Sequence, residues 1–311
     1  MTITFIGDVM LGENLFHIGR GIRTNFKNKF HELLNTTVQE IFSETDVLMF
    51  NMEYSLIEND SNIIEDPRHI VYRGDIESLN FFKNVKGILV ANIANNHFSQ
   101  HGVTSAIYTK QILKKNNILI AGCDNQPLTI ETSKKKIRIW GVSLISDSKY
   151  CGQYWLSDTK EIIEAISKFN GSKEPNELWI LSIHWGNEYI ETPQSEQIAF
   201  SDLALSNGID IIAVHHPHVT QPIYSLREKF TIFSLGNFIF DQNFSKKTQE
   251  GLIVMYDDES KKIEKVYKTR QIKYVIRDVF ETTVEEFNFS KNEIRNLPIS
   301  QIGRASCRER V

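Results

Sequence analysis

Short apolar runs in this chain end in polar segments that are rich in histidine, carboxylate and amide side chains. The runs at residues 47–50, 87–91, 178–183 and 209–214 are largely apolar, which is typical of strands buried inside a protein. A similar strand at residues 2–6 ends at a Gly–Asp pair. Because the carboxyl ends of neighbouring strands meet at one edge of a sheet, we expect these polar segments to form one site.

The histidines indicate the chemistry of this site. Six of the nine histidines lie in the polar segments that follow the strands, namely His97, His101, His184, His215, His216 and His218. Asp8 adds a carboxylate near the N-terminus, and Asn95 and Asn96 add amide oxygens. Imidazole, carboxylate and amide oxygen together are typical ligands of a hydrolytic divalent-metal centre.

The segment His216-Pro217-His218 is the strongest single indication of a metal site. Proline favours an extended backbone between the two histidines, so imidazoles two residues apart can point the same way. The alternative is a tag-like surface cluster, which the preceding apolar strand disfavours. Taken alone, Asp8 fits a strand-end turn as well as a metal ligand, and His184 fits a buried core histidine better than a ligand.

Two further segments leave functional and structural interpretations open. Asn51 and Glu53 share one face if the chain stays extended, so Glu53 could bridge two metals or be an exposed loop carboxylate. In Asn95-Asn96-His97, an amide oxygen could bind metal and the histidine could protonate a leaving group. The same asparagines could instead cap the helix that starts near Gly102. We interpret Gly236-Asn237 as a structural turn.

The composition is that of an ordinary globular protein and excludes several functions. A net charge of −4 gives no electrostatic reason to expect nucleic acid or an anionic membrane as a partner. Three cysteines without a C-x-x-C spacing make a disulfide framework or a thiolate zinc site unexpected. No signal peptide and no run of about 18 apolar residues is visible, so we expect a cytoplasmic protein without a transmembrane segment.

We expect one domain over residues 1–301. Residues 302–311 match the in-frame translation of a common sequencing adapter, so we exclude them and expect the natural C-terminus to be missing. Apolar spacing predicts helices at 26–44, 76–82, 103–115, 158–169 and 194–206, a further strand at 118–121, and hairpins at 128–144 and 251–272. The alternation of strands and helices predicts a layered α/β fold with mixed sheets.

Taken together, these segments resemble the CapA-type (poly-γ-glutamate) family of capsule synthesis proteins within the calcineurin-like metallophosphoesterase superfamily. The resemblance covers roughly residues 2–250. The matching segments, in order, are Gly7 to Gly12, Asn51 to Glu53, Ala94 to His97, His184 to Glu188, Asp210, His216 to Val219 with Gln221-Pro222, and Ser234 to Asp241.

The resemblance implies a four-layer α/β/β/α sandwich with two mixed sheets, the calcineurin-like metallophosphoesterase fold. It also implies a two-metal centre, and a mixed nitrogen and oxygen ligand set suits Mn, Fe or Zn about equally. By position, the implied ligands are Asp8, Glu53, Asn96, His184, His216 and His218. His97 takes the place of a general acid, and Arg73, Asn95 and Glu188 take substrate-binding places.

The implied activity is a metal-dependent, in-line hydrolysis of a phosphoester or polymer-related small substrate. In this mechanism the metals activate water and His97 protonates the leaving oxygen. Met10 stands where active phosphoesterases have a ligand histidine, which the capsule family usually lacks too, so the resemblance implies one weakly held metal. Two further positions depart from the family pattern, because Gln100 replaces a usual aspartate and Val214 a usual glycine. A second interpretation is therefore a non-catalytic, metal-stabilised subunit of a polyglutamate or capsule synthesis or export machinery.

Overall fold

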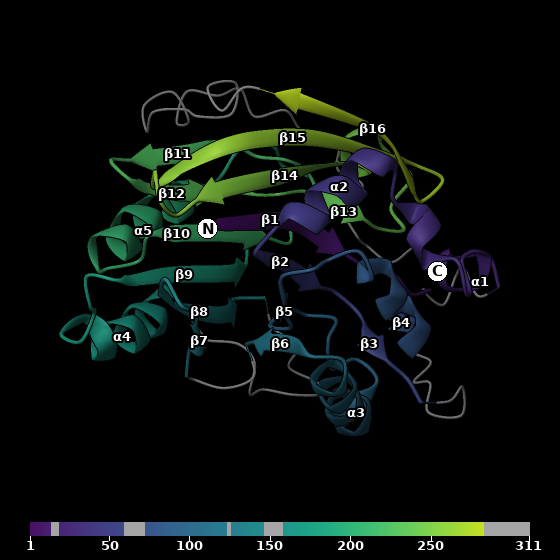
Figure 1. Cartoon of the computed structure of the whole chain (residues 1–311), viewed down its shortest axis with the longest axis horizontal. Coiled ribbons are helices and arrows are strands. Elements are labelled where there is room, and N and C mark those ends of the chain that lie inside the picture. Colours follow the sequence, from purple (N-terminus) through teal and green to yellow (C-terminus); the bar gives the residue numbers. More distant parts are fainter. Residues whose placement is uncertain (14–18, 59–71, 123–125, 146–157, 283–311) are drawn as a thin grey trace.

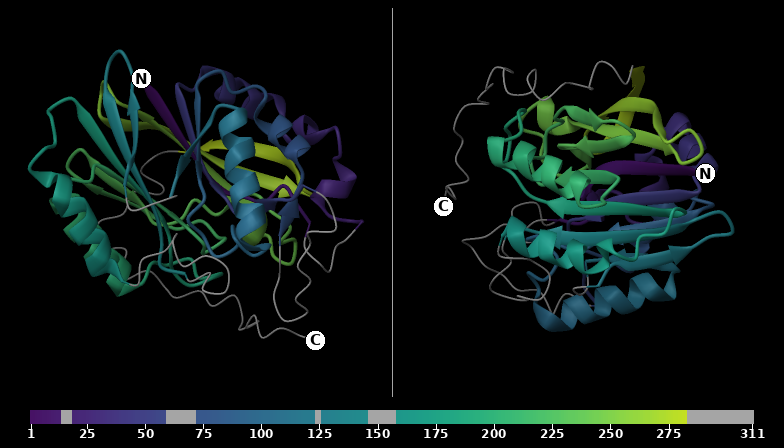
Figure 2. Two further views of the ribbon diagram at one scale, coloured as in Figure 1. Left: turned by 90° about the horizontal axis from the view of Figure 1, so that it is seen from below. Right: turned by 90° about the vertical axis from the view of Figure 1, so that its left-hand side faces the viewer.

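The computed structural model describes residues 1–13, 19–58, 72–122, 126–145 and 158–282. Within these residues two β-sheets pack face to face, and helices cover the outer face of each sheet (Figure 1, Figure 2). This arrangement confirms the expected four-layer α/β/β/α sandwich with two mixed sheets. The segment at 302–311 and all three cysteines lie outside the described residues.

The larger sheet has eight strands and carries the N-terminus of the chain. Its order is β16-β15-β14-β1-β2-β5-β6, and β13 also pairs with β1. The strands are β1 (Thr2–Val9), β2 (Val47–Met52), β5 (Ile88–Asn92), β6 (Ile118–Ala121), β13 (Asn237–Ile239), β14 (Glu250–Asp257), β15 (Lys262–Ile272) and β16 (Val275–Thr282). Strands β1, β2, β5 and β6 run parallel, and β14, β15 and β16 join β1 as an antiparallel meander.

The smaller sheet has six strands in the order β11-β12-β10-β9-β8-β7. They are β7 (Leu128–Glu131), β8 (Lys136–Ser143), β9 (Glu177–His184), β10 (Ile211–His215), β11 (Ile223–Leu226) and β12 (Lys229–Ile232). The four central strands run parallel, and β7 and β11 are antiparallel edges. A separate parallel pair consists of β3 (Ser55–Leu56) and β4 (Arg73–Gly74).

The helices are divided between the outer faces of the two sheets. Those on the larger sheet are α1 (Ile22–Asn25), α2 (Thr36–Glu44), α3 (Gly102–Lys115) and the 3₁₀ helices η2 (Phe30–Leu33) and η4 (Ile76–Phe82). The smaller sheet carries α4 (Thr159–Asn170) and α5 (Ser195–Ser206). A short 3₁₀ helix, η5 (Lys247–Gln249), precedes β14.

The packing explains why the strands are apolar without alternation. In β9, Leu178 and Ile180 face the other sheet, whereas Trp179 and Leu181 pack against α4 and α5. Strand β2 behaves in the same way, with alternate residues in the core between the sheets and in the helical layer. Both faces of these strands are covered, so both sets of side chains must be apolar.

The stretch at 26–44 does not form the single helix that its spacing predicts. It contains η2 and α2, and Asn35 separates them. The Asn35 side chain accepts a hydrogen bond from the backbone N of Val38 at 3.0 Å and starts α2. Asparagine competes for backbone donors in this way, which stops a helix from continuing through it. Residues 76–82 form a 3₁₀ helix rather than the expected α-helix.

The hairpins expected at 128–144 and 251–272 are present as β7–β8 and β14–β15. The structure adds two pairings that the sequence did not indicate, β11 with β12 and β15 with β16. Strand β16 is only partly buried, so its residues lack the continuous apolar run by which the central strands were found.

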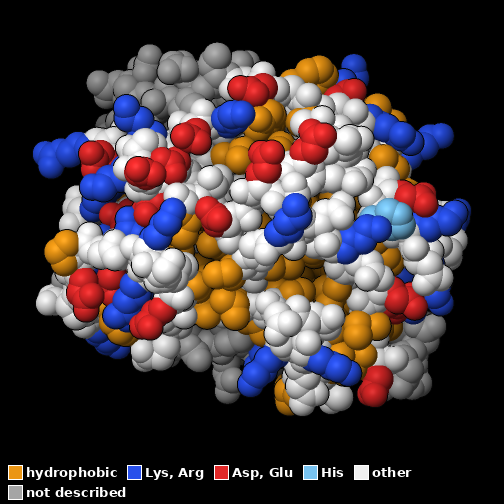
Figure 3. Space-filling model, viewed as in Figure 1, with side chains coloured by type: hydrophobic (Ala, Val, Ile, Leu, Met, Phe, Trp, Pro, Cys, Tyr) orange, Lys and Arg blue, Asp and Glu red, His pale blue; other side chains and the backbone are white. Residues whose placement is uncertain are grey.

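The surface carries both signs of charge. Acidic and basic side chains are interspersed over the face shown in Figure 3, and they do not gather into one basic patch there. None of the helices in the described part of the chain combines the length and apolar character that a bilayer crossing requires.

One buried carboxylate at the amino end of the smaller sheet gives a pH-dependent prediction. Glu177 accepts from Arg138 Nε at 3.1 Å and from Trp179 Nε1 at 3.0 Å, and it pairs with Lys136. Burial raises the pKa of Glu177, but these three donors outweigh it and lower the pKa from 4.5 to about 2. A carboxylate with a lowered pKa stabilises the fold above its unfolded pKa and loses that contribution as the pH falls through its folded pKa.

Glu177→Gln is therefore expected to reduce the free energy of unfolding by about 2 kcal/mol at pH 7. The difference from wild type should shrink as the pH falls from about 4.5 towards 2, where the wild-type carboxylate is protonated. Urea unfolding at several pH values measures this, with the exposed Glu174→Gln as control. A stability difference that stays constant over this pH range would contradict the prediction.

Candidate metal centre

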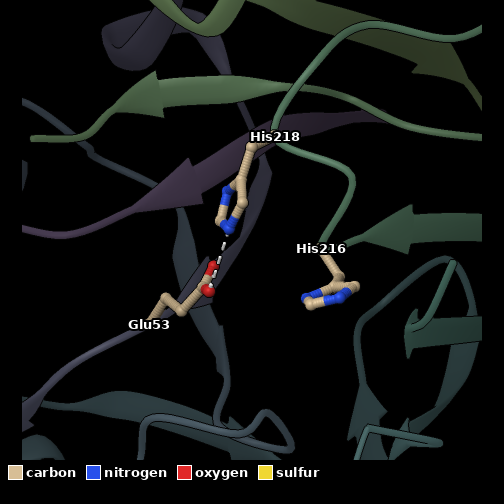
Figure 4. A group of neighbouring side chains, drawn as sticks. All are labelled: Glu53, His216 and His218. Atoms are coloured by element: carbon tan, nitrogen blue, oxygen red, sulfur yellow. Dashed lines mark ion pairs between the residues drawn. The ribbon is translucent and has the colours of Figure 1, made fainter. Parts of the chain in front are cut away.

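Five side chains meet at the carboxyl ends of strands from both sheets. Asp8 lies in β1, Glu53 follows β2, His184 ends β9, and His216 and His218 follow β10. Ligand atoms of Glu53, His216 and His218 all lie within 4.8 Å of one another, and so do those of Asp8, Glu53 and His184. Figure 4 shows Glu53 and His218 pointing toward one another, with His216 on the same loop as His218.

Four donors surround the buried carboxylate of Asp8. Asn51 Nδ2 donates to Oδ1 at 2.9 Å, and His215 Nδ1 lies 3.1 Å from the same oxygen. His218 Nδ1 lies 3.2 Å from Oδ2, and the backbone N of His216 donates to Oδ2 at 3.3 Å. Burial raises the pKa of Asp8, but the hydrogen bonds from His215 and His218 outweigh it and hold the pKa well below 3.8. Asp8 is therefore a carboxylate at neutral pH.

Glu53 is a second buried carboxylate, and one of its oxygens is unsatisfied. Oε1 has no hydrogen-bond partner among the described residues. It lies 3.5 Å from His218 Nε2, 3.7 Å from His97 Nε2 and 3.9 Å from His184 Nε2. Burial raises the pKa of Glu53 well above 4.5 despite the opposing charge of His218. Three imidazole nitrogens thus surround one unpaired carboxylate oxygen.

The donor atoms of this group fit a divalent cation. Nδ1 of His216 is also buried without a hydrogen-bond partner in the part of the chain that the structure describes. Buried polar atoms nearly always have a hydrogen-bond partner. Two buried atoms without one in the same group, Glu53 Oε1 and His216 Nδ1, indicate a cation site. Burial lowers the pKa of His216 to about 3 and that of His184 well below 6.5. Both imidazoles are therefore neutral, which is the form that coordinates metals.

His218 has the opposite protonation. Burial lowers its pKa, but the charge of Glu53 and the hydrogen bond to Asp8 outweigh burial and raise the pKa to about 10. Two buried carboxylates require positive charge close by, and the His218 proton supplies it here. Since imidazole coordinates only in its neutral form, a divalent cation would take over this charge from the proton.

The backbone of the His216-Pro217-His218 segment differs from the extended one that we expected. His216 has a φ of 96° and His218 a φ of 57°, both in the left-handed region that is unfavourable for residues other than glycine. The expectation of an extended backbone is therefore wrong. The ring centroids of His216 and His218 still lie 5.9 Å apart. The contacts of this buried loop hold its strained backbone in place.

His97 lies at the edge of the group and is held by two side chains. Its backbone N donates to Asn95 Oδ1 at 3.1 Å, and its Nδ1 lies 2.8 Å from Gln100 Oε1. Asn95 in turn donates to Asn51 Oδ1 at 3.1 Å. The other ring nitrogen of His97 is the one that lies near Glu53. Gln100, which departs from the family pattern, therefore orients His97 through an amide instead of a carboxylate.

Asn96 lies between two histidines. Its Oδ1 is 2.8 Å from His184 Nε2, and its Nδ2 is 3.2 Å from His97 Nε2. Neither this asparagine nor Asn95 caps the next helix, because α3 begins after His101 without a side-chain cap. The capping interpretation is wrong, whereas the turn at Asn95 is present.

The predicted substrate-binding residues have different environments. Arg73 is 5% exposed, and its Nη2 lies 3.7 Å from Glu13 Oε2, while the two backbones exchange hydrogen bonds. Burial, together with the charge of Arg73, lowers the pKa of His101 to about 4.

Glu188 is half-buried, and its charge acts on Glu53. Asn95 is 3% exposed and holds the loop in place. Substrate contact by Arg73, Asn95 and Glu188 stays a prediction.

The structure gives a role in the site to three residues for which the sequence had predicted none. Asn51 donates to Asp8, His215 bonds the same carboxylate, and Asn237 Oδ1 lies 2.9 Å from His218 Nδ1. Asn237 therefore orients a site histidine, so its interpretation as only a turn residue is wrong. Asn51 and His215 lie at the carboxyl ends of β2 and β10, the same signal that identified Asp8 and His184, whereas Asn237 is the first residue of β13.

The fold and these side chains define the class of protein: a layered α/β sandwich with a buried histidine–carboxylate group whose ligand atoms fit a divalent cation. Comparison with protein families narrows this class. Residues 2–242 match the family described as bacterial capsule synthesis protein PGA_cap, and the chain belongs to this family.

Two Bacillus proteins are similar to this chain. The PGA biosynthesis protein CapA of Bacillus subtilis (strain 168) is 27% identical over 268 residues, which cover 82% of this chain and 67% of the relative. The capsule biosynthesis protein CapA of Bacillus anthracis is 26% identical over 273 residues, which cover 82% of this chain and 63% of the relative. The match thus spans about two thirds of the length of these relatives.

A solved structure also aligns with the chain. The 5'-nucleotidase precursor from Thermus thermophilus aligns over 93% of this chain and 55% of its own, with 10% identity and a TM-score of 0.47.

Proposed function

We propose that this protein is a metal-dependent phosphoester hydrolase that acts in the synthesis of a bacterial capsule polymer, the process after which its Bacillus relatives are named. The observation that carries the proposal is the buried Oε1 of Glu53, which has no hydrogen-bond partner among the described residues and has three imidazole nitrogens around it. Membership of the capsule synthesis family supports the biological setting.

The proposed cofactor is a pair of divalent metal ions, Mn, Fe or Zn. Glu53 belongs to both groups of candidate ligands, one with Asp8 and His184 and the other with His216 and His218. Glu53 would therefore hold metal in both groups, and Asn96, whose Oδ1 lies 2.8 Å from His184 Nε2, would join the first group. Nitrogen and oxygen donors in this mixture do not favour one of the three metals.

The chemistry divides between the metals and the protein. Bound metals would activate water and stabilise negative charge on the phosphoryl oxygens. His97 would protonate the leaving oxygen, since its Nε2 faces the group while Gln100 holds Nδ1. Asn95 would keep the His97 loop in place through its bonds to Asn51 and to the backbone O of Met52. The net charge of −4 favours a small substrate over nucleic acid.

A specific observation keeps a non-catalytic subunit as the second candidate. Met10 is fully buried two residues after Asp8, and its sulfur accepts a hydrogen bond from the backbone N of Gly12 at 3.2 Å. It therefore provides no imidazole where the resemblance to active phosphoesterases would place one. A protein with one fewer ligand could hold metal for stability without turnover.

The activity of His97 variants distinguishes these candidates. His97→Ala is expected to lower kcat on a phosphoester substrate by about 10²- to 10⁴-fold, because general acid catalysis contributes that much. The metal content should stay unchanged, since His97 lies outside both groups of candidate ligands. Turnover of the Mn-loaded protein on a panel of phosphoesters, with elemental analysis beside it, measures both.

The matched control is His31→Ala, which changes a half-buried histidine in η2 of the helical layer. It should leave turnover and metal content as in wild type. Fully metal-loaded wild-type protein that turns over no phosphoester would overturn the hydrolase proposal and favour the non-catalytic subunit.

A further inference from the structure

An ordered tyrosine lies directly beside the candidate metal centre. The Tyr189 ring stacks on His218, with 6.2 Å between ring centroids and 29° between the planes. Its backbone N donates to the O of Pro217 at 2.8 Å, within the His-Pro-His segment. Tyr189 has a φ of 62°, a conformation that a bulky residue adopts only where its surroundings enforce it.

The far end of the same tyrosine is fixed by a network that also orients His218. Gln242 Nε2 donates to the Tyr189 hydroxyl at 3.2 Å, and Gln242 Oε1 accepts from Asn237 Nδ2 at 3.0 Å. Asn237 in turn bonds His218 Nδ1 at 2.9 Å. The tyrosine ring and the site histidine are thus held by one connected set of side chains, which fixes the ring relative to the centre.

Phe244 extends this aromatic surface towards solvent. Its ring meets Tyr189 edge-on, at 5.1 Å and 87°, and the side chain is 61% exposed. A single exposed phenylalanine is ordinary, but this one contacts a ring that itself contacts a site histidine. Close to these rings in the chain, Lys247 pairs with Glu191, which adds polar groups to the same region.

The position of the rings indicates the kind of leaving group that they would contact. A phosphoryl group at the histidines and carboxylates would place its ester substituent over a surface that begins at Tyr189, 6.2 Å from the His218 ring. The Phe244 edge and face offer no hydrogen bonds, so they select by apolar and aromatic contact. Aromatic rings prefer edge-to-face or offset partners, and Phe244 leaves such a position open to solvent.

We infer that Tyr189 and Phe244 form a subsite for an aromatic ring carried near the phosphorus of the substrate. The inference rests on the proposed function and names its substrate class: aryl-type phosphoesters rather than purely aliphatic ones. An aromatic contact of this kind strengthens binding by about three- to tenfold.

Two phosphonates that cannot be hydrolysed test this subsite by calorimetry on the Mn-loaded protein. Phenylphosphonate and methylphosphonate share the anionic group and differ in the ring. Phenylphosphonate is expected to bind wild type about three- to tenfold more tightly. Phe244→Ala should remove this difference and leave methylphosphonate binding unchanged. Phe244→Leu, which keeps an apolar side chain without a ring, should remove most of it.

Phe280→Ala is the matched control, because Phe280 is 54% exposed but lies on the edge strand β16. It should keep the preference for phenylphosphonate. Equal binding of both phosphonates to wild type would overturn the subsite and leave the hydrolase proposal standing. Equal losses in the Phe244 and Phe280 variants would also overturn it. If neither phosphonate binds, the phosphoryl site fails and the subsite fails with it.

Discussion

Replacing His216 and His218 together by alanine is expected to abolish metal binding at the group that these two histidines form with Glu53. Wild-type protein purified without chelator should carry about one or two ions per chain, since its ligand atoms form two overlapping groups. The double variant leaves one of those groups with only Glu53, too few ligands to hold an ion. Elemental mass spectrometry on untagged protein measures the metal content, which should fall by about one ion per chain in the variant because only one of the two groups is lost.

A second variant separates metal loss from unfolding. Removing His218 leaves the buried carboxylates of Asp8 and Glu53 without the imidazole that pairs with both. Breaking a buried ion pair in this way lowers the free energy of unfolding by about 3–5 kcal/mol. His216→Ala avoids this, because His216 is neutral and its Nδ1 has no hydrogen-bond partner among the described residues. We expect this single variant to fold and still lose the ion of this group, because only Glu53 and His218 remain there. Wild-type protein that binds neither Mn nor Zn would contradict the proposed metal centre.

Gly7→Ala is expected to destabilise the protein by about 3 kcal/mol or more. A Cβ on Gly7 would lie 2.0 Å from the backbone O of Gly236 and 2.9 Å from that of Leu235. The same Gly236 oxygen accepts the hydrogen bond of Asp8 N at 2.9 Å. Backbone atoms cannot rotate away as a side chain can, so β1 must separate from the chain before β13. Because this also displaces Asp8, metal affinity should fall with stability.

Urea unfolding measures the stability change, and Gly171→Ala is its matched control. Gly171 ends α4 with a φ of −73°, and a Cβ there would meet nothing within 4 Å. That variant should be neutral or gain about 0.4–1 kcal/mol, because alanine has less freedom in the unfolded chain. Gly7→Ala protein as stable as wild type would show that β1 and β13 can separate without cost.

Apolar patterns in short segments were sufficient to predict the strands whose two faces are both buried. The apolar runs at 178–183 and 209–214 predicted β9 and β10, and their polar ends predicted where the site lies. The helix expected at 26–44 was wrong, because an N-cap such as Asn35 acts through one hydrogen bond and leaves no trace in apolar spacing. The partly exposed β16 was missed for the related reason that its burial depends on its neighbour β15.

Within the site, strand register decided what the sequence left open. Asn51 pairs with Asp8 across β1 and β2, and His215 pairs with His184 across β9 and β10. Successive residues of a strand point to opposite faces, so a shift by one residue would exchange which strand-end side chains meet. Arg73 illustrates the same limit, since its pairing with Glu13 depends on an isolated bridge between distant segments.

The sequence by itself determined the layered α/β class, the buried strands and the strand ends that carry histidines and carboxylates, because burial and periodicity are properties of short segments. Only the tertiary structure decided which of those side chains converge. Asp8 and His215 stand 207 residues apart and yet touch, and Phe244 meets the Tyr189 ring that stacks on His218. Such contacts depend on the register and packing of both sheets together, which no single segment specifies.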